Sequence, residues 1–165
     1  MMFSYRKTYF YIFICCVVAM AIALYVQYVD HIEPCLLCML QRVFYVALGL
    51  TALVAALHYR ARFARYLYNW LALIFTLLGL LAAGRQVWLQ HLPPSSQANS
   101  FCLPGYKYLI ENQAWSVLFK AIFSNAPDCA KISWTFLRLS MAEWSLVLFI
   151  VLLLLVLRQF RARSK

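Results

Sequence analysis

Four long apolar stretches alternate with polar segments along the chain. The runs without a charged side chain are residues 8–29, 43–59, 66–84 and 144–157. A helix needs about 20 residues to cross the ~30 Å of hydrocarbon in a bilayer, with a lower limit of about 17. The first three runs meet this length by count. The fourth is shorter, but its flanking Glu143 and Arg158 suit the interfaces, where a long basic side chain reaches the headgroups.

This pattern predicts an all-α membrane protein, a bundle of four transmembrane helices in one domain over residues 1–165. With interfacial residues included, we expect spans at about 8–29, 43–59, 66–89 and 144–160, and outer loops at about 30–42 and 90–143. The composition agrees, because 65% hydrophobic and 12% charged residues are too apolar for a soluble domain. The first run is too long for a cleavable signal peptide and lacks a small-residue cleavage site.

Basic residues indicate the orientation in the membrane. The two termini and the loop between the second and third runs hold nine of them and no acidic residue: Arg6, Lys7, Arg60, Arg62, Arg65, Arg158, Arg161, Arg163 and Lys165. All five acidic residues lie in the segments on the opposite side. The positive-inside rule therefore predicts that both termini are cytoplasmic. The formal net charge of +10 reflects this topology, so we infer no nucleic-acid binding from it.

Four of the six cysteines fall in the outer segments: Cys35, Cys38, Cys102 and Cys129. On the outer side of a bacterial inner membrane, disulfides persist. Four cysteines allow three pairings, of which the local one joins Cys35 to Cys38 and leaves Cys102 with Cys129. The sequence leaves the resting pairing open. Cys15 and Cys16 lie inside the first apolar run and are expected to be small packing residues.

The segment between the third and fourth spans contains a candidate surface helix. Residues 93–100 form a polar linker that precedes Cys102. Within residues 113–123, apolar side chains recur at i, i+3, i+4 and i+7, at Trp115, Leu118, Phe119 and Ile122. This spacing predicts a short amphipathic helix lying on the membrane surface between Cys102 and Cys129. A disulfide between these two cysteines would be able to move.

The first outer segment ends in a Cys-x-x-Cys pair, Cys35 and Cys38, at the expected start of the second helix. The positive end of a helix dipole favours a thiolate at this place. Arg42 follows Cys38 at i+4 on the same helix face, where it is either a partner of the thiol chemistry or a headgroup anchor. In a soluble protein the pair would suggest zinc or a thioredoxin-like site. In a membrane protein it indicates electron exchange with a lipid-soluble carrier, and we expect no metal.

Three groups of residues follow one another in a characteristic order. The first is Pro34-Cys35-x-x-Cys38-x-x-Gln41-Arg42, and the second is Gly84-x-Gln86 with Leu89-Gln90-His91. The third comprises Cys129-Ala130, Trp134, Phe136-Leu137, Leu139, Met141 and Trp144. With four spans and a cysteine pair in each outer loop, this order resembles the disulfide bond formation protein B (DsbB) family. Gln41 stands where some relatives carry Glu, and the vicinal Cys15 and Cys16 are not part of the pattern.

The resemblance implies an enzyme, a thiol:quinone oxidoreductase of the bacterial inner membrane. Such proteins reoxidise a periplasmic thioredoxin-like dithiol oxidase of the DsbA type and pass two electrons through two disulfides to ubiquinone or menaquinone. The residues it implies as catalytic are Cys35, Cys38, Cys102 and Cys129. Those it implies as quinone contacts are Arg42, Arg85 and His91, although Arg85 equally suits lipid anchoring and His91 a solvated interface.

Three other functions deserve comparison with this one. A scaffold stapled by two disulfides would explain the cysteines but would give Arg42 below the Cys-x-x-Cys pair no purpose. A transporter or channel needs buried ionisable or discontinuous elements in its spans, and these spans have almost none. A paralogue with the same chemistry and a dedicated partner is compatible with the sequence, which also leaves the quinone type and the oligomeric state open.

Overall fold

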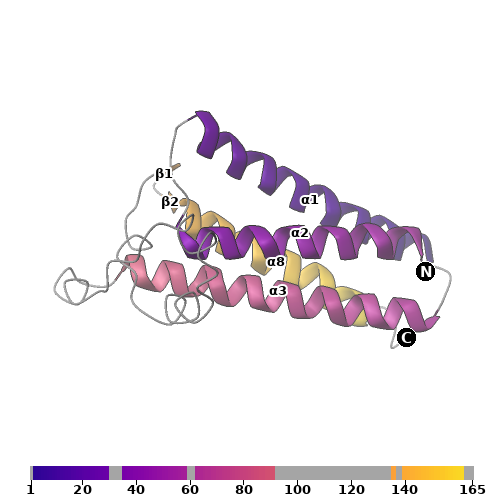
Figure 1. Cartoon of the computed structure of the whole chain (residues 1–165). Coiled ribbons are helices and arrows are strands. Elements are labelled where there is room, and N and C mark those ends of the chain that lie inside the picture. The colour runs from indigo at the N-terminus through magenta and orange to yellow at the C-terminus, as the bar shows by residue number, and fades with distance from the viewer. Residues whose placement is uncertain (1, 30–34, 59–61, 92–134, 137–138, 162–165) are drawn as a thin grey trace, which may run out of the picture.

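The computed structural model describes residues 2–29, 35–58, 62–91, 135–136 and 139–161. Over these residues the chain forms four long helices and one two-stranded antiparallel ribbon (Figure 1). The helices are α1 (Met2–Val29), α2 (Leu36–Leu57), α3 (Arg62–Gln90) and α8 (Met141–Arg161). The ribbon pairs β1 (Thr135–Phe136) with β2 (Leu139–Ser140), directly before α8.

All four helices are long enough and apolar enough to cross a membrane. The shortest candidate span, Met141–Arg161, has 21 residues, which at the helical rise covers about 32 Å. The prediction of an all-α, four-helix membrane protein is therefore confirmed. The expected surface helix at residues 113–123 lies outside the described residues, as do Cys102 and Cys129.

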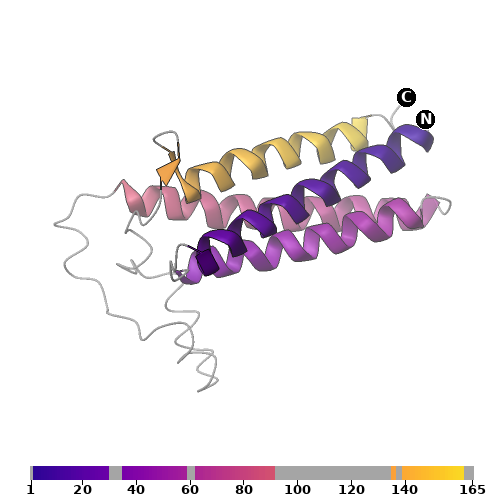
Figure 2. The same cartoon turned by 90° about the horizontal axis from the view of Figure 1, so that it is seen from above.

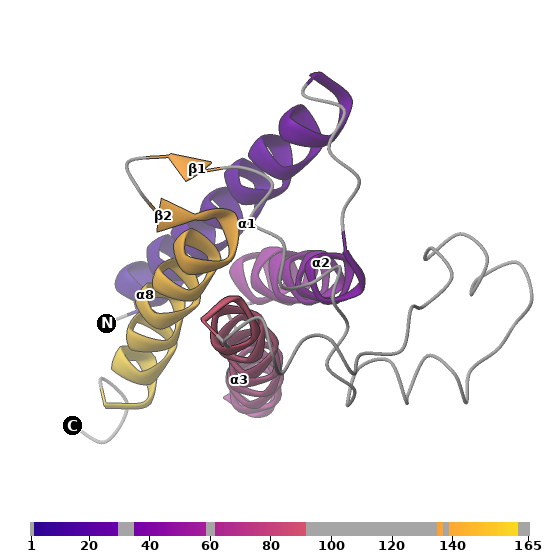
Figure 3. The ribbon, with the colours of Figure 1, turned by 90° about the vertical axis from the view of Figure 1, so that its left-hand side faces the viewer.

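The bundle is built from sequential neighbours. Helix α1 packs along α2, α2 along α3, and α3 along α8, whereas α1 and α8 touch only lightly. Figures 1 and 2 show that α1 and α8 approach each other at the end that carries both termini and diverge toward the end where α2 begins. The view along the bundle in Figure 3 shows α2 and α3 side by side, with α8 next to α3. The axes of α1 and α8 are therefore farthest apart at the end where α2 begins.

The core is a narrow stripe of apolar side chains along the bundle axis. Its fully buried large residues are Tyr9, Ile12, Leu48, Phe149, Leu152 and Val156. Many large apolar side chains point outward instead, among them Phe63 at 80% and Leu81 at 69% exposure. Such a surface would be costly in water, but it suits contact with acyl chains. The outward apolar surface is therefore the part of the fold that the membrane covers.

Two glycines let helices approach closely, as small residues do in membrane bundles. At Gly49 on α2, an added Cβ would lie 3.3 Å from Cys16 Cβ on α1. At Gly79 on α3, an added Cβ would overlap the ring of Phe149 on α8. Cys16 is accordingly buried in the core between α1 and α2.

Candidate functional site

Cys35 and Cys38 form the start of α2. Cys35 is the N-cap, in an extended conformation (φ −72°, ψ 168°), and its Sγ accepts a hydrogen bond from the backbone N–H of Cys38 at 3.4 Å. Its carbonyl accepts from the N–H of Met39 at 3.0 Å, which closes the first helical turn. Both cysteines are in the thiol form, and Cys35 Sγ donates to Cys38 Sγ at 3.2 Å. The two sulfurs are therefore placed to form a disulfide with little movement of the backbone.

Two buried amides lie under the cysteine pair. Gln86 Nε2 of α3 lies 3.0 Å from Cys38 Sγ and 3.6 Å from Cys35 Sγ, so it donates to the sulfurs. Gln41 Nε2 of α2 donates in turn to Gln86 Oε1 at 2.7 Å. Both glutamines are at most 5% exposed. The sequence indicated Gln41 and Gln86 as motif positions but not as site residues. A polar amide in each of two otherwise apolar helices could have indicated that the two side chains bond to each other or to a site.

Arg42 lies one turn below Cys38 and reaches across to α1. Its Nη2 donates to the backbone carbonyl of Ala23 at 3.0 Å, and its Nη1 donates to Gln27 Oε1. Nη1 also lies 3.8 Å from the sulfur of Met39. The guanidinium is thus held between α1 and α2 at partial burial, with its charge fixed near the end of the bundle where α2 begins.

A cavity of about 730 Å³ opens between α1, α2 and α8. Its polar lining includes Cys38, Gln41, Arg42 and Tyr45 of α2, and most of the remaining wall is apolar side chains of α1 and α8. Tyr45 is held by a 3.0 Å hydrogen bond between its hydroxyl and Ser145 Oγ, and its ring stacks on Phe149. Small-molecule sites have this volume range and this combination of apolar walls with a few polar groups. The cavity therefore has the size and lining of a site for an apolar small molecule with a few polar atoms.

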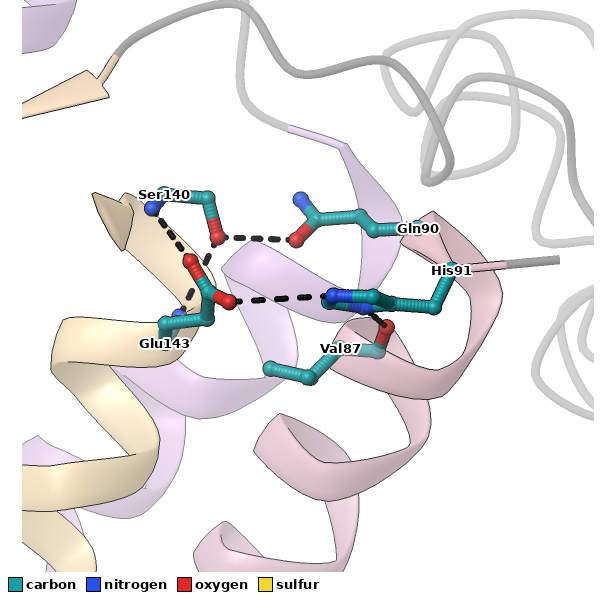
Figure 4. Close-up of polar contacts among 5 residues, drawn as sticks. All are labelled: Val87, Gln90, His91, Ser140 and Glu143. Atoms are coloured by element: carbon teal, nitrogen blue, oxygen red, sulfur yellow. Dashed lines mark hydrogen bonds and ion pairs between the residues drawn. The ribbon is translucent and has the colours of Figure 1, made fainter. Parts of the chain in front are cut away.

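A second polar cluster joins the C-terminal end of α3 to the N-terminal end of α8 (Figure 4). Ser140 and Glu143 form a capping box at the start of α8: Glu143 Oε2 accepts from Ser140 N at 2.6 Å, and Ser140 Oγ accepts from Glu143 N at 3.3 Å. Ser140 Oγ also donates to Gln90 Oε1 of α3 at 2.8 Å. His91 Nε2 lies 4.0 Å from Glu143 Oε1, and His91 Nδ1 lies 2.9 Å from the carbonyl of Val87.

The structure brings together three of the seven site residues that the sequence indicated. Cys35, Cys38 and Arg42 lie within the first two turns of α2. His91 directly follows α3 and has an exposed side chain beside Glu143, and Arg85 is partly buried on α3. Among the described residues, neither Arg85 nor His91 lines the cavity. Cys102 and Cys129 lie outside the described residues, so the structure places only one of the two cysteine pairs.

Comparison with known proteins gives one consistent result. The family model described as "Disulfide bond formation protein DsbB" matches residues 5–159. A protein named disulfide bond formation protein B from Acinetobacter baumannii is 41% identical, over 96% of this chain and 92% of the relative. Proteins of the same name from Nitrosococcus oceani and Stutzerimonas stutzeri are 38% and 35% identical, over 92% and 98% of this chain and 89% and 98% of the relatives.

Proposed function

The chain belongs to the DsbB family, and from this premise we propose that it oxidises a periplasmic DsbA-type dithiol protein and delivers the electrons to a membrane quinone. Membership makes it a multi-pass membrane protein of disulfide bond formation. The observation that carries the finer proposal is that Cys38 and Arg42 line the same cavity. A redox-active sulfur and a fixed cation thus meet in a space open to apolar ligands.

The proposed route has two thiol–disulfide exchanges. The reduced partner first attacks the Cys102–Cys129 disulfide, so that the partner gains a disulfide and the loop pair becomes two thiols. The loop pair then reduces the Cys35–Cys38 disulfide and is itself reoxidised. Each exchange moves two electrons and proceeds through attack of a thiolate on a sulfur. We assign the partner-facing role to Cys102, because it follows the polar linker at residues 93–100.

The chain's own residues prepare the last transfer at the cavity. Cys38 is the cysteine of the pair that lines the wall, while Cys35 caps the helix above it. A quinone bound here would supply an acceptor of two electrons and two protons. The Arg42 guanidinium stabilises negative charge that develops beside it, and the apolar walls exclude water and strengthen that interaction. Arg85 and His91 do not line the cavity wall. We therefore propose them only as more distant contacts of the quinone.

Energetics restrict how the Cys35–Cys38 pair can work. A DsbA-type partner is a strong oxidant at about −120 mV, whereas structural disulfides lie below about −300 mV. A gap of about 180 mV amounts to roughly 8 kcal/mol for two electrons. Oxidation of the partner by a relaxed disulfide would therefore be unfavourable by about this amount of free energy. Both disulfides, Cys35–Cys38 and Cys102–Cys129, must therefore be unusually oxidising, or the quinone must draw the exchanges forward.

The fold supports this function over a transporter. Among the described residues, the buried polar side chains inside the helices are neutral, namely Gln41, Asn69, Thr76, Gln86 and Gln159. Ion and solute pathways through membranes are marked instead by buried ionisable residues. Both termini lie at one end of the bundle, and α2 begins at the other (Figure 1), where Cys35 is its N-cap. With the positive-inside rule, we infer cytoplasmic termini, periplasmic cysteines and an inner-membrane location.

Anaerobic mixing of the purified full chain, a reduced DsbA-type partner and either ubiquinone or menaquinone tests the proposal. We expect one partner disulfide for each quinone reduced, with alkylation reporting the thiols and ultraviolet absorbance reporting the quinone. Cys38→Ala should abolish quinone reduction. Partner oxidation that proceeds equally without a quinone, or thiols and quinones that never change together, would refute the proposed function.

A further inference from the structure

We propose that Gln86 is a positioning residue that stabilises the reduced Cys35–Cys38 pair, and that Gln41 fixes the orientation of the Gln86 amide. The inference rests on the proposed function and adds a reason why this pair would be a strong oxidant. It concerns three side chains on two helices: Cys38 and Gln41 on α2, and Gln86 on α3.

The contacts form a continuous hydrogen-bond chain from the Gln41 amide through Gln86 to the sulfurs. Gln41 Nε2 donates to Gln86 Oε1 at 2.7 Å, and Gln86 Nε2 donates to Cys38 Sγ at 3.0 Å. The same nitrogen lies 3.6 Å from Cys35 Sγ, so one amide group serves both sulfurs. Gln41 and Gln86 are 5% and 4% exposed, which leaves little water to replace these bonds. This hydrogen-bond chain joins α2 to α3 directly beneath the cysteine pair.

The donor-to-acceptor direction of this hydrogen-bond chain decides its effect on the sulfurs. A glutamine amide has an acceptor oxygen at one corner and donor N–H groups at the other. Because Gln41 donates to the oxygen of Gln86, the N–H group of Gln86 is left to face the sulfurs. If the Gln86 amide were reversed, its nitrogen would meet the nitrogen of Gln41 and its oxygen would meet Cys38. Gln41 therefore selects the orientation that gives the sulfurs a donor.

A donor at this place favours the reduced state of the pair. A hydrogen bond to an ionised acceptor is about twice as strong as one between neutral groups. The N–H of Gln86 therefore binds a Cys38 thiolate more strongly than the neutral sulfur of a disulfide. A disulfide whose reduced form is stabilised is a stronger oxidant. Gln86 thus shifts the pair in the direction that oxidation of a DsbA-type partner demands.

A redox titration of Gln86→Leu tests the first part. The full chain carries Cys15→Ala, Cys16→Ala, Cys102→Ala and Cys129→Ala, so that Cys35 and Cys38 are its only remaining cysteines and only this pair responds to the buffer. Two glutathione thiols reduce this disulfide to two thiols and become one glutathione disulfide, and alkylation reports the fraction reduced. We expect the equilibrium to shift about tenfold toward the protein disulfide, which is about 30 mV for a two-electron couple. A shift of less than twofold would overturn the proposal.

Two further variants separate this effect from altered packing. Thr76→Val removes a buried hydroxyl that donates to the carbonyl of Ala72 on the same helix, about 15 Å from Gln86 along the axis; it should leave the equilibrium unchanged. Gln86→Asn keeps the amide but retracts it by one methylene, and it should shift the equilibrium in the same direction as Gln86→Leu. The Asn variant also decides the question if the Leu variant does not fold.

A double-mutant cycle tests the role of Gln41. If Gln41 acts by orienting Gln86, then Gln41→Leu should shift the equilibrium in the wild-type background but add little once Gln86 is Leu. Additive shifts would show that the two residues act separately and would overturn the orienting role. This titration needs neither quinone nor partner. A failure of the wild-type protein to reduce quinone would thus refute the proposed function and leave this inference standing.

Discussion

Arg42 Nη2 donates a hydrogen bond to the backbone carbonyl of Ala23, 3.0 Å away on the neighbouring helix. The other terminal nitrogen of the guanidinium donates to Gln27 Oε1, four residues further along α1. A planar guanidinium can serve two such acceptors at once, whereas an ammonium offers a point charge. The cation is therefore held at the cavity wall below Cys38 and cannot turn freely toward the headgroups.

Arg42→Gln should weaken quinone reduction through loss of this fixed charge. We expect the apparent KM for quinone to rise and kcat/KM to fall by about 10²-fold, the scale of a lost electrostatic contact to developing charge. Arg42→Lys should restore only part of the loss, because lysine keeps the charge without the two-pronged geometry. Steady-state titrations with quinone measure both effects. Unchanged quinone kinetics in Arg42→Gln would reduce Arg42 to a headgroup anchor.

Single-turnover exchange with the partner is the matched control for Arg42→Gln. In the proposed route that step uses Cys102 and Cys129 and does not involve the quinone. We expect its rate to stay near that of the wild type. Equal losses in both assays would point to a general folding defect instead.

Cys129→Ser should trap the DsbA-type partner as a mixed disulfide through Cys102. Without Cys129, no second thiol in the loop pair can resolve the bond formed when the partner attacks. Non-reducing electrophoresis followed by mass spectrometry of the cross-linked peptide identifies the cysteine. A complex joined through Cys35 or Cys38, with the loop pair dispensable, would reverse the proposed order of exchange.

Functional residues that share one helix can be placed together from the sequence alone. Cys38 and Arg42 share a face of α2 because they are four residues apart, and the structure places both on the cavity wall. The four transmembrane helices can also be predicted from the sequence, since length and lack of charge decide whether a segment can cross hydrocarbon. Even so, α2 begins at Leu36, well before the uncharged run at residue 43. The roughly two additional turns include Arg42, whose guanidinium forms hydrogen bonds with α1.

Contacts between helices are harder to predict. Gln86 and Cys38 are 48 residues apart, and nothing in the spacing within either helix indicates that they meet. Their contact depends on the rotation and depth at which α3 packs on α2, which close packing of many side chains determines together. The same reasoning applies to His91, whose position in the sequence suits the outer interface but whose side chain lies beside Glu143 rather than in the cavity wall.

Cys35→Ser should leave Cys38 as a thiol on the cavity wall, able to contact a quinone but unable to form the local disulfide. We expect stronger visible absorption from contact between the Cys38 thiolate and the quinone ring, with no multiple turnover. Cys38→Ser should lose that absorption, because Cys35 caps the helix and does not line the cavity. Absorbance spectra of both variants with bound quinone measure this. Colour retained in Cys38→Ser and lost in Cys35→Ser would exchange the two roles.

Gly79→Ala should destabilise the bundle even though alanine is the better helix former. On an open helix face the change would gain about 1 kcal/mol, but here the new methyl group would overlap the buried ring of Phe149. Overpacking of this kind typically costs about 1–3 kcal/mol. Gly84→Ala is the matched control on the same helix, because its Cβ would lie 3.8 Å from Leu146, an ordinary contact. Unfolding of both variants in mixed detergent measures the difference, and equal stability would show that α3 and α8 are less closely packed than the structure indicates.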